Sequence, residues 1–144
     1  MAFVLNPFTG QFDAVSDPID EPISTEADCS AAEAVGDCVY VSADAVSGVI
    51  QVRKVDVTDS AKMPAIGMIL DKATSTTCTV ALLGTVPVGS LPAFVPGKRY
   101  FVGASSKPVA VPPATPPVLV QVVGIALDSG RLLFNPSPNM TKLT

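Results

Sequence analysis

The stretch "AIGMILDKATSTTCTVALLG" (residues 65–84) decides the fold class of this chain. It contains two short runs rich in Ile, Leu and Val, joined by a polar segment of Asp, Lys, Ser and Thr. Short runs of branched apolar side chains, bounded by turn residues, are typical of β-strands that pair in a hairpin. The stretch therefore predicts two antiparallel strands.

A second version of this stretch, "VVGIALDSGRLLFNPS" (residues 122–137), follows later in the chain. In both versions a glycine is followed by three apolar residues and an aspartate, so that Gly67 corresponds to Gly124 and Asp71 to Asp128. We expect each aspartate to cap backbone N–H groups of the turn that follows it. The likeness indicates an internal repeat; the alternative is chance similarity between Val- and Gly-rich strands.

The likeness extends upstream, because "GDCVYVSA" (36–43) resembles "GKRYFVGA" (97–104). Val- and Ile-rich runs separated by Gly, Pro, Ser and Asp continue through the rest of the body. We therefore expect a mainly β body over residues 24–144, a small sandwich or barrel of short antiparallel strands. Its two related halves are expected at about 36–90 and 91–138.

The first part of the chain has a different character. Residues 1–23 contain three prolines, which disfavour a helix or a central strand, so we expect an extended N-terminal arm. The alanine-rich stretch "STEADCSAAEAV" (24–35) predicts the one short helix, because Thr25 and Asp28 have the spacing of a capping box and Gly36 could end it.

Composition and charge indicate a subunit of an assembly. Hydrophobic residues make up 48% of the 144 residues and charged residues 15%, and the mean hydropathy is +0.46. No apolar run reaches the roughly 20 residues that span a bilayer, so we expect no membrane partner and assign the apolar surplus to contacts with other subunits.

Residues 1–52 carry nine acidic and no basic side chains (−9), and residues 53–144 carry nine basic and four acidic ones (+5). The basic side chains lack a regular aromatic array, which argues against nucleic-acid binding.

The residues needed for common catalytic sites are missing. The chain has no histidine and no glycine-rich phosphate loop, so we expect neither enzymatic activity nor a cofactor. Asp56 and Asp59 could pair as carboxylates, but "DVTDS" is typical of a polar turn. Cys29, Cys38 and Cys78 lack metal-ligand spacing, and we expect buried thiols and no metal; a disulfide between Cys29 and Cys38 is left open.

The arm is the candidate binding segment. Three phenylalanines within its first twelve residues would each cost roughly 1.5–3 kcal/mol if left in water, so the arm either folds back or binds another chain. "PFTG" (7–10) predicts a turn within it. The candidate partner-binding residues are Phe3, Asn6, Pro7, Phe8, Thr9, Gly10, Phe12 and Asp13.

Three stretches carry a resemblance to a known class of proteins. "NPFTGQFD" (6–13) resembles the start of small structural proteins of tailed bacteriophages. "LPAFVPGKRYFVGASSKP" (91–108), followed by "LVQVVGIALDSGRLLFNPS" (119–137), is similar to a β-rich segment of phage head-decoration, head-fibre and tail-fibre proteins. Residues 44–90 carry no such resemblance.

The resemblance implies a virion structural protein, assembled in the host cytoplasm. The leading expectation is a trimeric decoration or cement protein that binds the major capsid protein, or another virion protein, on the outside of the head. The alternative is a tail-side or fibre-adaptor protein that attaches a fibre or joins a baseplate. A carbohydrate-binding β domain is a third hypothesis, which the absence of tryptophan disfavours.

Overall fold

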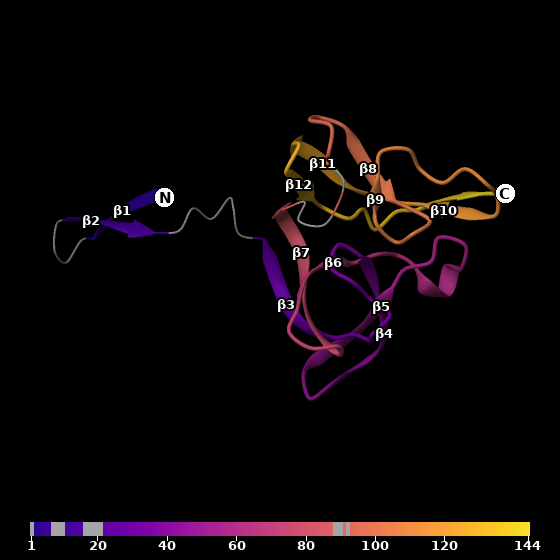
Figure 1. Cartoon of the computed structure of the whole chain (residues 1–144), viewed down its shortest axis with the longest axis horizontal. Helices are drawn as coiled ribbons and strands as arrows, with labels where there is room; N and C mark the ends of the chain where they lie inside the picture. The colour runs from indigo at the N-terminus through magenta and orange to yellow at the C-terminus, as the bar shows by residue number, and fades with distance from the viewer. Residues whose placement is uncertain (1, 7–10, 16–21, 88–90, 92) are drawn as a thin grey trace.

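Both predicted hairpins are present in the structure, a computed structural model, and the fold is mainly β as expected (Figure 1). The structure describes residues 2–6, 11–15, 22–87, 91 and 93–144. The hairpin at 65–84 is formed by β6 and β7, and its second version by β11 and β12. Each hairpin is part of a larger unit, and we call these units the first repeat and the second repeat.

Five strands form the first repeat, which covers residues 23–83. They are β3 (Ile23–Asp28), β4 (Cys38–Val46), β5 (Val49–Lys54), β6 (Gly67–Lys72) and the first part of β7 (Thr77–Pro87). Their order is β3-β5-β4-β6-β7, and β7 also pairs with β3. The first repeat is therefore a closed barrel of five strands, whose only parallel pair among the described strands is β3 with β5.

The predicted helix over residues 24–35 is wrong. The structure has the strand β3 up to Asp28, followed by turns, because β3 pairs with β7 on one side and with β5 on the other and so closes the barrel. Two ladders of hydrogen bonds outweigh a weak local preference for helix. Among the described residues, the one helical element is the 3₁₀ turn η2 (Ser60–Lys62).

The second repeat covers residues 84–134 and uses the end of β7 as its first strand. The other strands are β8 (Arg99–Val102), β9 (Pro108–Val109), β11 (Val122–Asp128) and β12 (Arg131–Phe134). The order β7-β12-β11-β8-β9 repeats the order β3-β7-β6-β4-β5 of the first repeat. Within the described residues no pairing of β9 with β7 closes this sheet, so the second repeat is an open version of the first.

The two repeats agree residue by residue. Val39 pairs with Gly67 in the first repeat, and Tyr100 pairs with Gly124 in the second. Both hairpins also shift register just before the aspartate noted in the sequence, between Ile69 and Asp71 and between Ala126 and Asp128. Shared pairing and shared irregularities show that the sequence likeness reflects a structural repeat.

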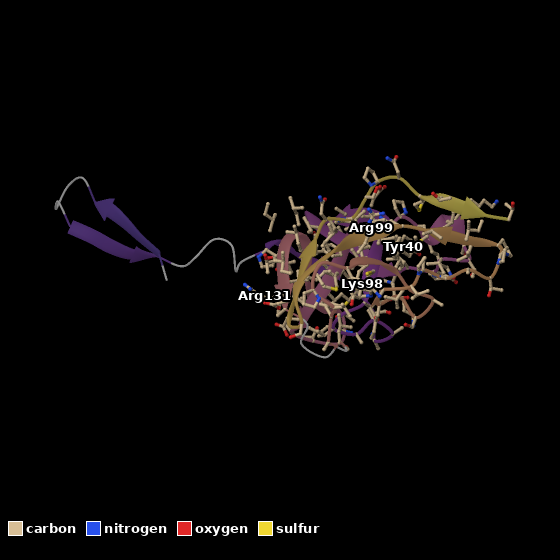
Figure 2. The ribbon with its side chains drawn as sticks, turned by 90° about the horizontal axis from the view of Figure 1, so that it is seen from above. Tyr40, Lys98, Arg99 and Arg131 are labelled. Carbon is tan, nitrogen blue, oxygen red and sulfur yellow. The ribbon has the colours of Figure 1, made fainter. Side chains whose placement is uncertain are left out.

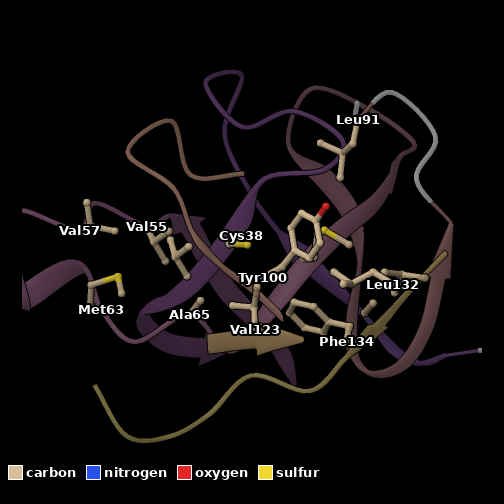
Figure 3. Close-up of a cluster of buried hydrophobic side chains, with 14 of the residues drawn as sticks. Cys38, Val55, Val57, Met63, Ala65, Leu91, Tyr100, Val123, Leu132 and Phe134 are labelled. Carbon is tan, nitrogen blue, oxygen red and sulfur yellow. The ribbon is translucent and has the colours of Figure 1, made fainter. Parts of the chain in front are cut away.

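Two hydrophobic clusters hold the body together. The smaller lies inside the barrel and contains Ala27, Cys29, Val39, Val52, Ile69, Cys78 and Val80. The larger lies between the barrel and the second repeat (Figure 3). The first repeat contributes Cys38, Met68 and Ala81 to the larger cluster, among others. The second repeat contributes its inner side, including Tyr100, Leu132 and Phe134.

Strand β7 belongs to both repeats and changes face between them. Ala81 and Val86 both lie in the larger cluster, although strict alternation would direct residues five apart to opposite faces. Gly84 lies between them with φ of +118°, a conformation that favours glycine. The irregularity at Gly84 lets one strand serve both repeats.

Two small sheets complete the described structure. The last strands along the chain, β10 (Val118–Val120) and β13 (Thr141–Leu143), pair antiparallel with each other. Near the N-terminus, β1 (Ala2–Asn6) and β2 (Gln11–Val15) form an antiparallel hairpin that lies apart from the body in Figure 1. The arm thus contains a paired hairpin where the sequence predicted an extended segment, and Ile23 at its predicted end belongs to β3.

Candidate interaction surface

The outer side of the second repeat is apolar. Along β11 and β12, side chains alternate between the larger cluster and the surface, which leaves Ile125, Leu127 and Leu133 46%, 43% and 40% exposed. Ile125 and Leu133 are direct cross-strand partners. Because paired residues of neighbouring strands point to the same side of a sheet, these two side chains form one continuous apolar area.

Cationic side chains border this apolar area. Arg99 on β8 is the partner of Ile125 on the other side of β11 and is exposed. Arg131 starts β12 and donates from Nε to Asp128 Oδ2 at 2.8 Å. Figure 2 labels both arginines on the second repeat. We call the surface made by Arg99, Ile125, Leu127, Arg131 and Leu133 the basic-apolar face.

Asp128 belongs to the turn beside this face. Its Oδ1 accepts from Gly130 N at 2.8 Å, as the sequence predicted for a turn-capping aspartate. The Gly130 N–H and the Arg131 guanidinium lower the pKa of Asp128 below its ordinary value. The carboxylate is therefore charged at neutral pH and neutralises part of the charge of Arg131, while Arg99 keeps the rim of the face cationic.

The same positions in the first repeat are buried. Met68 corresponds to Ile125 and is 1% exposed, and its partner Ala81 corresponds to Leu133 and is 0% exposed. Cys38, which pairs with Met68, corresponds to Arg99 and is also 0% exposed. The second repeat covers this face of the first repeat. The same face of the second repeat is left exposed.

Sequence reasoning missed the basic-apolar face. The signal was present, because in "VVGIALDSGRLLF" (122–134) both alternating sets of residues are apolar. A strand that is apolar on both sides is expected to be covered on both sides. The sequence could not say which side the rest of this chain covers.

Those predicted arm residues that the structure describes are not brought to this face. Phe3, Asn6, Phe12 and Asp13 lie on β1 and β2, which pair with each other. Pro7, Phe8, Thr9 and Gly10, with the predicted turn at 7–10, lie outside the described residues. The binding role of the arm stays a prediction.

The most buried carboxylates serve the fold. Glu33 is 4% exposed and accepts from Ser30 N at 2.7 Å and from Lys54 N at 3.1 Å. Burial alone would raise the pKa of Glu33, but these hydrogen bonds outweigh burial and lower it below its ordinary value. Asp37 pairs with Lys107, an ion pair that joins the first repeat to the second. These charged groups are engaged in structural contacts.

The carboxylates of the predicted polar turn also cap backbone groups. Asp56 Oδ1 accepts from Thr58 N at 2.9 Å, and Asp59 Oδ1 accepts from Ala61 N at the start of η2, also at 2.9 Å. Hydrogen bonds from Thr58 lower the pKa of Asp56. The geometry is that of turn-capping carboxylates, as expected from the sequence.

The three cysteines are free and buried. Cys29 and Cys38 do not form the disulfide that the sequence left open. Burial raises the pKa of Cys38 and of Cys78 to about 12, so both thiols are neutral at physiological pH. Buried neutral thiols pack as small apolar side chains and are poor nucleophiles.

The described residues include neither a cluster of metal ligands nor a helix that could span a membrane. They contain no group of three or more Cys, Asp or Glu side chains placed to hold a metal ion. In the described part of the chain, no helix has the length and apolar character that crossing a bilayer requires.

Two open grooves also lie on the body. One is lined by Arg53, Lys54, Lys62 and neighbouring residues of the barrel. The other lies between Val57 and the proline-rich segment 113–117.

Comparisons with protein-family models, with curated proteins and with solved structures found no match for this chain. The basic-apolar face is therefore the strongest candidate site, on physical grounds alone.

Proposed function

We propose that this chain is a structural protein of a tailed-bacteriophage virion, and that it decorates and stabilises the outside of the head. The observation that carries the proposal is the basic-apolar face, an apolar area that a folded chain normally covers. The resemblance of residues 6–13, 91–108 and 119–137 to phage structural proteins supports the choice of a virion.

Attachment would use many weak contacts at once. The major capsid protein, or another virion protein, would receive the arm, whose Phe3, Phe8 and Phe12 supply apolar anchors. A paired hairpin such as β1–β2 keeps an open edge on each strand, and an exposed edge can add a strand to a neighbouring sheet. In a homotrimer three arms would act together, which raises the overall affinity without new contacts. The proposal requires no cofactor and no catalytic step.

A second candidate is a tail-side or fibre-adaptor protein. It is favoured by the position of the β1–β2 hairpin, which lies apart from the body in Figure 1 as a connecting segment would. Such a protein would use the arm to hold a fibre or a baseplate component. It would be present in far fewer copies than a protein of the shell.

The experiment uses phage particles that lack this protein. Full-length protein should bind such particles, and protein lacking residues 1–15 should stay folded and fail to bind. Replacing Phe8 and Phe12 by Ala should weaken binding with little change in melting temperature, and Val111→Ala, at a position 76% exposed on the body, is the control.

Unchanged binding by the truncated protein would exclude the arm as the attachment device. A large drop in melting temperature for the double Phe variant would show instead that the arm folds back. The copy number in purified virions separates the two candidates, because hundreds of copies indicate the shell and about a dozen or fewer indicate the tail.

A further inference from the structure

We infer that the basic-apolar face binds the acidic first repeat of a second copy of this chain, so that copies join head to tail. The inference deepens the proposed function and rests on its assumption that the chain self-assembles. It names the two surfaces through which one copy meets the next.

The repeat itself shows what kind of surface covers this face. In the first repeat, the positions of Ile125, Leu133 and Arg99 are taken by Met68, Ala81 and Cys38, and a sheet of this same chain covers them. The face in the second repeat keeps the apolar character at two of these three positions. At the third, a cysteine is replaced by the exposed Arg99, which favours an occupant that carries negative charge.

The charges of the two repeats are complementary. Residues 23–83 carry eight acidic and four basic side chains (−4), and residues 84–134 carry four basic and one acidic one (+3). Contact between the second repeat of one copy and the first repeat of another therefore brings opposite charges together. Contact between two second repeats would bring like charges together, which costs several kcal/mol when they are juxtaposed closely.

The first repeat offers a matching surface beside the turn between β4 and β5. Val46 at the end of β4 is 62% exposed and lines an open groove together with Glu26 and Asp28 of β3. We call the surface made by Glu26, Asp28 and Val46 the acidic end.

The two surfaces are complementary in apolar character and in charge. The acidic end supplies an exposed valine beside two carboxylates, and the basic-apolar face supplies exposed Ile and Leu beside arginines. Different patches on the two partners make a heterologous contact, which produces closed rings, such as the expected trimer, or open rows of copies.

The first experiment measures the assembly state of the purified full-length chain by sedimentation velocity. The wild-type chain should self-associate, and the association should weaken as salt concentration rises because the charges are screened. Ile125→Glu and Arg99→Glu should each weaken association by about tenfold or more, because each places a negative charge against the carboxylates of the acidic end. Val111→Glu, a comparable change at an exposed position on neither surface, should assemble like the wild type.

The second experiment tests the head-to-tail arrangement by mixing. A chain with Ile125→Glu keeps its acidic end, and a chain with both Glu26→Lys and Val46→Lys keeps its basic-apolar face. Each should be monomeric alone, and the mixture should form a one-to-one pair. All of these substitutions lie at exposed positions, and circular dichroism checks that each variant is folded.

Three results would overturn the inference: a monomeric wild-type chain, Ile125→Glu protein that assembles like the wild type, or a mixture that stays monomeric. The particle-binding assay separates this inference from the proposed function. A monomeric wild-type chain that still binds particles overturns the inference alone, and an assembling chain that does not bind particles overturns the proposed function alone.

Discussion

Gly124 lies against the backbone of the neighbouring strand. A Cβ added there would lie 2.3 Å from the carbonyl oxygen of Leu133, and the corresponding Cβ on Gly67 would lie 2.3 Å from Cγ1 of Val80. The sequence showed that these two glycines correspond. It could not show that each is needed for a close contact across its hairpin, because that reason lies in the partner strand.

The close contact at Gly124 leads to a stability prediction. Gly124→Ala should destabilise the protein by about 1–3 kcal/mol or more, because a backbone carbonyl cannot move aside as a flexible side chain can. Gly130→Ala is the matched control, since the nearest atom to its added Cβ is Asp128 Oδ1 at 3.6 Å. It should change stability by less than about 0.5 kcal/mol. Chemical denaturation measures the free energy of unfolding of both variants. Equal losses of stability would contradict the close contact assigned to Gly124.

At the scale of elements, strands were easier to predict than the segment 24–35. The apolar runs 67–72 and 122–128 were correctly predicted to be strands, because alternation and branched side chains favour a strand through local interactions. Residues 24–28 form β3 because β5 and β7 border it, and strands distant in the sequence supply that reason. Capping-box spacing and alanine content describe only what a segment prefers when it is alone.

Proline substitutions distinguish the strand from the helix. Ala27→Pro should unfold the protein or cost about 3 kcal/mol, because Ala27 is paired with both Ile50 of β5 and Cys78 of β7 and proline cannot donate to a ladder. Ala31→Pro should cost less than about 1 kcal/mol, because Glu33 N bonds to Ser30 O and places Ala31 at the second position of a turn, which suits proline. If 24–35 were a helix that starts at Thr25, the order would be reversed, because proline is tolerated in the first turn of a helix and Ala31 would lie in its interior. Thermal unfolding followed by circular dichroism gives the comparison.

At the scale of the whole molecule, the repeats are joined by more than a linker. They share β7 and bury a common cluster, and the Asp37–Lys107 pair crosses between them. Gln121, 1% exposed, accepts from Ala65 N at 2.8 Å and donates to Ala65 O at 2.9 Å. The sequence predicted two related halves. It could not predict that the inner side of the second repeat covers the outer side of the first repeat. This arrangement leaves the basic-apolar face of the second repeat exposed.

This shared interior predicts one cooperative unfolding transition. Phe134 is fully buried between the repeats, so Phe134→Ala should cost about 3–5 kcal/mol. Because the repeats unfold together, amide hydrogen exchange should accelerate by the same factor in β5 of the first repeat and in β11 of the second. Acceleration confined to β11 would show instead that the barrel unfolds independently. Val111→Ala, at an exposed position, should leave both rates unchanged.

The glycine within β7 has a consequence for natural variation. Ala81 and Val86 reach the same core because one irregular residue lies in the strand between them. Gly84→Val should favour a regular extended backbone, because a β-branched residue does not adopt φ of +118° without strain, and regular alternation would then direct Ala81 and Val86 to opposite faces. The residue type at position 84 is thus constrained more tightly than the residues on the surface, and we expect natural variants to differ in the loops and to keep glycine at this position.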